Sequence, residues 1–276
     1  MTKVSRLFGY RRQNYYKRVL YKREHVAEQE AVLASVLRKR ARMPRLGTRK
    51  LHHLMCMEGL SYGRDRLFRL LGDHRLLIKP LRRYIRTTDS KHWLKKHGNL
   101  VRELSATCPD RIWVSDITYI RTDQGYMYLS LVTDRFSRKI VGYDLSESLR
   151  TEGALNALKM AVDNRVGKAG QLIHHSDRGL QYCSSDYQRL LRESNIIPSM
   201  TEKYDPYENA LAERMNGILK NEFLLSDGFA TKQLALMAIR ESIEIYNNER
   251  PHLSLGMEVP SEWYKRKDPN TLVEVL

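Results

Sequence analysis

Residues 112–120 read Ile-Trp-Val-Ser-Asp-Ile-Thr-Tyr-Ile, a run of β-branched and aromatic residues interrupted by one acid, Asp116. This composition is typical of a buried strand, because such side chains pack well on a pleated surface. A carboxylate inside the run is costly unless it is hydrogen-bonded or binds a metal ion. The stretch therefore predicts a strand that carries a candidate functional acid.

The residues that follow extend this sheet. Two further β-type runs lie at 126–134 and 139–145, with Gly125 in the first turn and a polar second turn at 135–138, so we expect an antiparallel meander. The later hydrophobic periods predict a helix at 151–166, a strand at 172–175, a helix at 185–192 and a strand at 196–200. Two further helices are predicted at 209–225 and 232–247. The order βββαβαβ predicts an α/β fold, a mixed five-stranded sheet flanked by helices, in a core at 111–265 before a tail at 266–276.

The chain before residue 111 has a different pattern. Apolar residues at three- and four-residue steps predict a helix at 25–42, striped by Val26, Leu33, Val36 and Leu37, and two short helices at 48–57 and 62–71. Gly59 lies in the connection, and Ser61 can cap the second short helix. We expect an all-α region at 1–86 with a helix-turn-helix candidate at 47–72, followed by a basic linker at 87–110. An ordinary helical hairpin with a basic face remains the alternative.

Charge separates the two regions. The 276 residues contain 48 Lys and Arg against 32 Asp and Glu, a net charge of +16, and residues 1–105 alone carry +19. Such a surplus predicts a polyanionic partner, here double-stranded DNA, although ribosomal and membrane-surface proteins show it too. The candidate DNA-binding residues of this region are Arg49, Lys50, Arg64, Arg66 and Arg69.

Other compositional features exclude several classes of protein. No apolar run is long enough to cross a bilayer, and the first residues lack the apolar core of an export signal, so we expect a cytoplasmic protein with no membrane partner. Three scattered cysteines, Cys56, Cys108 and Cys183, are too few for a disulfide framework. We expect them to be reduced core thiols.

Two further acids lie where the predicted sheet would bring them near Asp116. Asp177 directly follows the strand at 172–175, and Glu213 lies off the apolar stripe of its helix, on the face that also carries Asn216 and Lys220. Taken singly, Asp177 reads as a turn residue and Glu213 as a solvated helix residue. The two are separated by 35 residues.

At this spacing the sequence resembles the DDE transposases of the integrase-catalytic-core, retroviral-integrase-like superfamily, and in particular the second-frame (OrfB) proteins of the insertion-sequence-three family. The matching blocks are WVSDITYI at 113–120, DRFSRKIVG at 134–142, HSDRGLQY at 175–182, NALAE at 209–213 and YNNERPH at 246–252. One departure is Glu208, where the family more often has Asp. The resemblance extends over residues 40–265.

The resemblance implies a ribonuclease-H-like core in which Asp116, Asp177 and Glu213 are catalytic and hold two divalent cations, Mg²⁺ with Mn²⁺ as a substitute. A pair of such ions suits in-line phosphoryl transfer, and oxygen ligands suit the ions. It also implies that Lys220, Asn216 and Arg178 contact DNA. The expected function is a transposase that binds the terminal repeats of an insertion sequence, cuts their 3′ ends and joins them to target DNA. At least a dimer is expected on the DNA, with a possible upstream-frame partner protein.

Other readings stay open at this point. His175-Ser-Asp-Arg178 fits the His-x-x-Arg pattern of tyrosine recombinases, with Tyr204 and Tyr207 as nucleophile candidates, but the pattern ends a predicted strand rather than lying in a helical domain. A serine recombinase lacks a suitable serine near the start. A catalytically silent DNA-binding regulator derived from a transposase is a third possibility.

Overall fold

The computed structural model describes residues 12–79, 94–165, 171–202 and 209–266. The chain divides into two compact units, residues 1–79 and 80–276. The expected boundary at residue 86 and most of the expected tail at 266–276 lie outside the described residues.

The first unit is all-helical, as expected. It contains α2 (Arg12–Arg42), α3 (Thr48–Met57) and α4 (Arg64–Asp73). The predicted helix at 25–42 is thus only the second half of α2, and its buried positions are Val32, Ser35 and Val36, whereas Val26 and Leu37 are exposed. The residue that precedes α4 is Gly63, not Ser61.

The second unit contains the predicted mixed sheet of five strands. The strands are β1 (Ile112–Thr122), β2 (Gly125–Asp134), β3 (Ile140–Ser146), β4 (Leu172–Ser176) and β5 (Ile196–Met200). Their order across the sheet is β3-β2-β1-β4-β5. The β1–β2 and β2–β3 pairs are antiparallel, and the β1–β4 and β4–β5 pairs are parallel. The meander is therefore confirmed, and β1 is the central strand.

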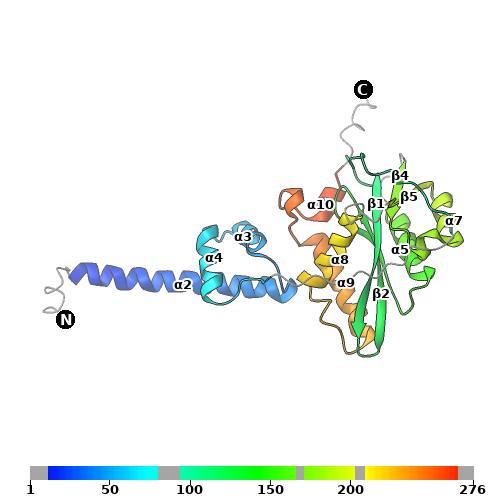
Figure 1. Ribbon diagram of the computed structural model, residues 1–276. Helices are drawn as coiled ribbons and strands as arrows, with labels where there is room; N and C mark the ends of the chain where they lie inside the picture. The colour runs from blue at the N-terminus through cyan, green and yellow to red at the C-terminus, as the bar shows by residue number, and fades with distance from the viewer. Residues whose placement is uncertain (1–11, 80–93, 166–170, 203–208, 267–276) are drawn as a thin grey trace, which may run out of the picture. The chain divides into compact units, whose positions relative to one another are not determined.

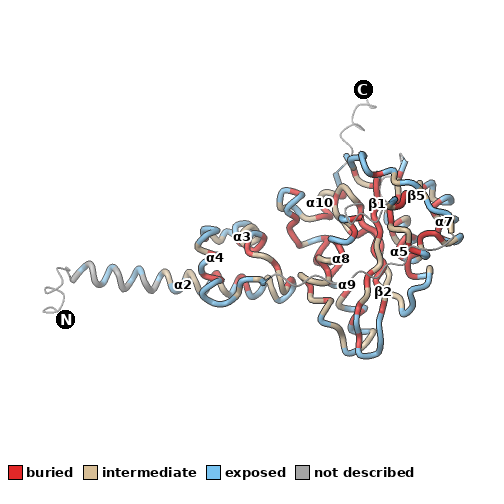
Figure 2. Tube along the Cα trace, viewed as in Figure 1, coloured by how far each residue is buried: buried red, intermediate tan, exposed pale blue. Residues whose placement is uncertain are grey.

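Helices cover both faces of the sheet (Figure 1). On one face lie α5 (Thr151–Asp163) and α7 (Ser185–Glu193), and on the other α8 (Ala210–Glu222), α9 (Lys232–Asn248) and α10 (Pro260–Tyr264). A short helix α6 (Leu180–Cys183), a 3₁₀ turn at Leu253–Leu255 and the helix α10 were not expected. Alternate residues of β1 face opposite layers, as expected for a strand. Trp113 packs in the cluster on the α5 side, and Val114 packs with Ala212 of α8. Figure 2 shows buried residues concentrated along the sheet and the helix faces that cover it.

Residues 94–110 differ from the expected linker. The Asn99 amide donates to Glu202 Oε1 (2.9 Å), the Leu100 amide donates to Ser199 Oγ (2.9 Å), and the Met200 amide donates to Gly98 O (3.2 Å). These bonds attach the segment to the end of β5. The described part of the expected linker is therefore part of the second unit, because its backbone groups pair with the sheet instead of with water.

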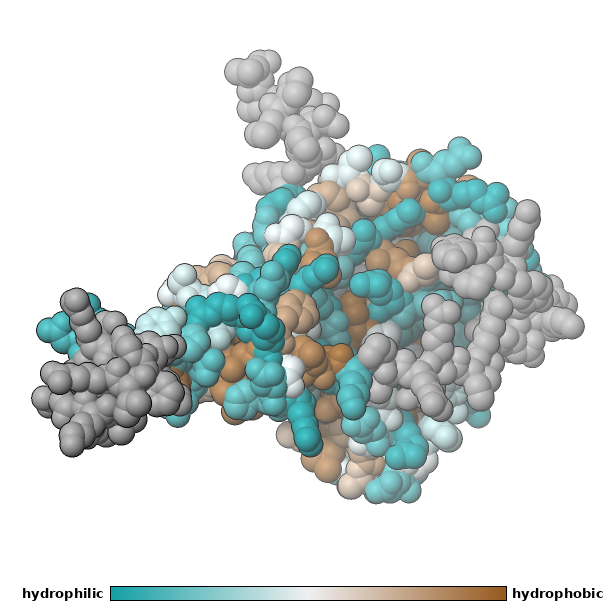
Figure 3. All heavy atoms as spheres, turned by 60° about the vertical axis from the view of Figure 1, so that its left-hand side comes forward, coloured by the Kyte–Doolittle hydropathy of each residue, from teal (hydrophilic) through white to brown (hydrophobic). Residues whose placement is uncertain are grey.

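The face drawn in Figure 3 shows hydrophobic residues in patches among hydrophilic ones. Among the described residues no helix is long and apolar enough to cross a membrane. Cys108 and Cys183 are buried free thiols as expected, but Cys56 is exposed on α3.

A buried histidine of β4 predicts acid sensitivity. His174 Nε2 lies 2.7 Å from Ser115 Oγ and 2.9 Å from the Tyr187 hydroxyl, and burial lowers the His174 pKa from 6.5 to about 3. In the unfolded chain His174 binds a proton near pH 6.5, and in the folded chain it does not. The contribution of neutral His174 to the free energy of unfolding is therefore full above pH 6.5 and is lost as the pH falls. At pH 5 the expected loss is about 2 kcal/mol. Urea unfolding at pH 7 and pH 5 should show that the wild type loses about 2 kcal/mol relative to His174→Gln; the comparison cancels the opposite contribution of Asp116, whose raised pKa favours the folded state as the pH falls. An equal change in both proteins would contradict the assignment.

Candidate active site

The register of two parallel strands places the first two acids next to each other. The β1–β4 ladder pairs Trp113 with His174 and Val114 with His175, and it ends there. Asp116 lies two residues beyond the last pair, on the same face of β1 as Val114, and Asp177 directly follows the last residue of β4. Both acids therefore lie just beyond the end of the ladder.

Both oxygens of Asp116 are held. The Ile117 amide donates to Oδ1 (2.9 Å) and Asn216 Nδ2 donates to Oδ2 (2.8 Å). Burial raises the Asp116 pKa to about 7, and the negative charges of Asp177 and Glu213 add to the rise, while the two hydrogen bonds oppose it. The three acids therefore lie near enough for their charges to interact.

One face of α8 brings the third acid over the strand. Asn209 Nδ2, just before the helix, donates to Ser115 O (3.1 Å), and Asn216 contacts Asp116 two turns later. Glu213 lies between them at helical spacing and shares their face. The helix is thus attached to β1 at Ser115 and at Asp116. Glu213 itself is exposed, at the rim of the site.

Asp177 and Lys220 complete the surroundings. Asp177 Oδ1 accepts a hydrogen bond from the Gly179 amide (2.9 Å) in the turn that leads into α6. Lys220 is half-buried, and burial lowers its pKa while the charge of Asp116 opposes this. Arg178 is partly exposed beside Asp177. Within the described ranges no three acidic, histidine or cysteine side chains converge closely enough to form a ready metal-ligand set.

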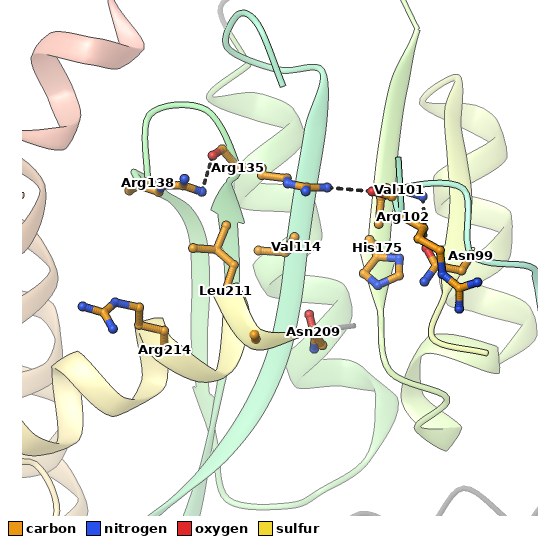
Figure 4. Close-up of a pocket in the computed structure, with 11 residues that line it drawn as sticks. Asn99, Val101, Arg102, Val114, Arg135, Arg138, His175, Asn209, Leu211 and Arg214 are labelled. Carbon is orange, nitrogen blue, oxygen red and sulfur yellow. Dashed lines mark hydrogen bonds between the residues drawn. The ribbon is translucent and has the colours of Figure 1, made fainter. Parts of the chain in front are cut away.

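A cavity of about 560 Å³ is lined by Val114 and His175, which lie two residues before Asp116 and Asp177 in the sequence. Figure 4 shows Arg135 and Arg138 from the β2–β3 turn on one side of it, with Leu211 and Arg214 from α8 and His175 from β4 around it. His175 is buried and its Nδ1 lies 2.9 Å from Ser199 Oγ, so it is a core histidine as well as a wall of the cavity.

The sequence relatives decide the family. Two family models, both for the integrase core domain, match residues 106–206 and 194–260. A 31 kDa protein of insertion element IS600 from Shigella sonnei, itself uncharacterized, is 38% identical over 95% of this chain and 98% of its own length. The transposase of insertion sequence IS3A from Escherichia coli (strain K12) is 32% identical over 84% of this chain and 80% of its own length. This chain belongs to the IS3-type transposases.

The fold agrees with that family. A simian T-cell lymphotropic virus intasome, solved in complex with the PP2A regulatory subunit B56 gamma, is similar over 81% of this chain and 76% of that chain, with a TM-score of 0.51 and 18% identity. At this identity the similarity concerns the fold alone. The IS3-type transposase therefore has the ribonuclease-H-like integrase core that its sequence blocks imply.

The basic residues expected to bind DNA in the first unit of the transposase fall into three groups. Arg49 and Arg69 are exposed. Arg64 pairs with Asp65 (2.9 Å), and Arg66 pairs with Glu28 (2.9 Å) and stacks on Tyr62. Lys50 is buried, with 8% of its surface exposed. Its burial argues against a role in DNA contact, because its side chain faces the interior of the unit.

The sequence interpretation missed the residues of the cavity. Its four arginines come from three separate segments: Arg102, the β2–β3 turn with Arg135 and Arg138, and Arg214 on α8. Arg135 and Arg138 lie inside one of the family blocks, which is a weak local signal. Asn209 was noted only as part of a block, although its hydrogen bond to Ser115 positions α8.

Proposed function

We propose that this chain cleaves DNA at the ends of its insertion element and joins the resulting 3′ ends to target DNA. The observation that carries the proposal is the electrostatic grouping of Asp116, Asp177 and Glu213 at the end of the β1–β4 ladder. Three mutually repelling carboxylates in a partly buried place are unfavourable unless a cation neutralises them.

The three acids fit Mg²⁺ chemically, because they offer only oxygen donors and their mutual repulsion is what a hard cation relieves. We infer that Asp116, Asp177 and Glu213 would hold two such ions. The chemistry supplied there would be charge neutralisation and activation of the attacking and leaving oxygens of a phosphodiester.

The other residues of the site orient and bind. The Ile117 amide and Asn216 fix the direction of the Asp116 carboxylate. Lys220 is close enough to interact with the Asp116 charge, so its ammonium can bind a phosphate of the DNA terminus. Arg178, next to Asp177, is proposed to bind a phosphate of the same DNA strand.

The test is a gel assay with duplexes that carry the element's own ends. We expect Mg²⁺-dependent nicking at the 3′ ends followed by strand joining. Binding without nicking would indicate a silent regulator, nicking without joining a nuclease, and a covalent protein–DNA adduct a tyrosine recombinase. Because one reaction joins two ends, we further propose at least two protomers on the DNA, and an upstream-frame protein as a possible partner.

The first unit is proposed to bind the terminal repeats through α3 and α4. These helices match the helix-turn-helix candidate at 47–72, and Gly59 in their connection has φ +79°, where other residues are strained.

Arg49→Ala and Arg69→Ala should each weaken end binding several-fold. Each should also reduce by about 1 the magnitude of the slope of the logarithm of the association constant against the logarithm of the salt concentration. Both side chains are exposed, so their loss removes a phosphate contact without a packing cost. Fluorescence anisotropy over a salt series would measure this. Arg192→Ala on α7 removes the same charge and should leave the slope unchanged. A wild-type affinity that does not vary with salt would contradict the proposed role of the unit.

A further inference from the structure

The cavity beside the acids faces the same side of the sheet as they do. Val114 and His175 line it; Val114 lies two residues before Asp116 on β1, and His175 lies two residues before Asp177, which follows the end of β4. Side chains two apart on a strand point to the same face, so Val114 and Asp116 share one. The cavity therefore lies close to Asp116, on the face of the sheet that carries this acid.

The lining of the cavity favours a phosphate. Four arginines line it, Arg102, Arg135, Arg138 and Arg214, and none of its eleven lining residues is acidic. Arg135 and Arg138 are partly buried, and desolvation lowers the pKa of both guanidinium groups. Guanidinium groups bind phosphate through two parallel hydrogen bonds, so desolvated arginines without a lining acid suit a phosphodiester.

Two buried atoms in the wall have no hydrogen-bond partner among the described residues. They are Asn209 Oδ1 and Arg138 Nε, and only 6% of the Asn209 surface is exposed. Asn209 Nδ2 is already used by Ser115 O, which leaves the oxygen as an acceptor. An amide oxygen accepts from the exocyclic amine of adenine or cytosine, and a guanidinium nitrogen donates to phosphate. Val114 and Leu211 supply an apolar surface against which a base can pack.

We propose that this cavity holds one unpaired nucleotide of the DNA strand beside the cleaved bond. The inference rests on the proposed function, because it takes the strand processed by the acids as the source of the nucleotide. The volume of about 560 Å³ lies within the range of about 300–1,000 Å³ typical of sites for small molecules. The arginines bind the phosphate, and Asn209 Oδ1 accepts from the base. The cavity thereby stabilises a frayed DNA end next to the acids.

The experiment compares two fluorescein-labelled duplexes of the element end, one fully paired and one with two mispaired nucleotides at the cleaved terminus. Anisotropy is measured in EDTA, so that no strand is cut. The wild type should bind the mispaired duplex about tenfold more tightly, and Arg102→Ala and Arg214→Ala should each lose most of this preference. Both residues are exposed, so the variants should fold. Arg192→Ala, on the opposite face of the sheet, should keep the preference.

Equal wild-type affinity for the two duplexes would overturn the inference, and so would an undiminished preference in both cavity variants. The gel assay separates the two proposals: a preference without Mg²⁺-dependent cleavage refutes the proposed function, and cleavage without a preference refutes the cavity.

Discussion

Asp116→Asn is expected to reduce DNA strand cleavage at least about 1,000-fold, which corresponds to roughly 4 kcal/mol of transition-state stabilisation, while leaving the binding of element ends nearly intact. The amide keeps the shape of the carboxylate but removes one negative charge from the group that would hold the cations. End binding is expected to persist because the first unit carries most of the net positive charge of the chain. Asp177→Asn and Glu213→Gln should behave alike.

Two controls distinguish the loss of a negative charge from the loss of the folded structure. Asp163→Asn makes the same chemical change at the exposed end of α5 and should leave cleavage unaffected. In metal-free protein Asp116→Asn should not lower the thermal midpoint, because it relieves the repulsion that raises the Asp116 pKa. Retained cleavage in Asp116→Asn would contradict the proposed role, and simultaneous loss of end binding and cleavage would indicate a structural residue instead.

Gly142→Ala is expected to destabilise the second unit by about 2–4 kcal/mol. A Cβ at this position in β3 would lie 2.0 Å from Ala157 O and 2.9 Å from Ala161 Cβ, both in α5. The obstacle is helix backbone, which cannot move aside as a flexible side chain can. The helix would have to move away from the sheet and open the packing around Leu158.

Chemical unfolding of the purified chain measures the change. Gly217→Ala is the matched control, because its Cβ would meet only Asn221 Nδ2 at 4.0 Å on α8. That variant should be neutral or stabilised by up to about 1 kcal/mol, since Ala favours a helix more than Gly does. Equal unfolding midpoints for Gly142→Ala and the wild type would show that α5 does not approach β3 as closely as described.

Much of this architecture is readable in local patterns. The period of two around Trp113 and the period of 3.6 through Leu219 predict the type and order of the main elements, which the structure confirms. The unexpected α6 spans only four residues, too short for a periodic signal. The start of α2 at Arg12 was missed, because the sequence before residue 25 was not assigned an apolar stripe.

Side-chain roles in the first unit could not be read in this way. Arg66 and Lys50 have the composition of DNA-binding residues, but one pairs with Glu28 and the other is buried. Whether a basic side chain also has a partner within the unit depends on which helix packs opposite, and no local pattern encodes that contact.

The order of strands and helices, the concentration of positive charge in the first 105 residues, and the three acids with their spacing follow from the sequence, since each depends on neighbours along the chain or on composition. The alignment of Asp116 with Asp177, the attachment of α8 through Asn209 and Asn216, and the cavity walled by four arginines depend on the tertiary structure. Parallel register and helix placement are set by packing between segments tens of residues apart, and no local period encodes those contacts.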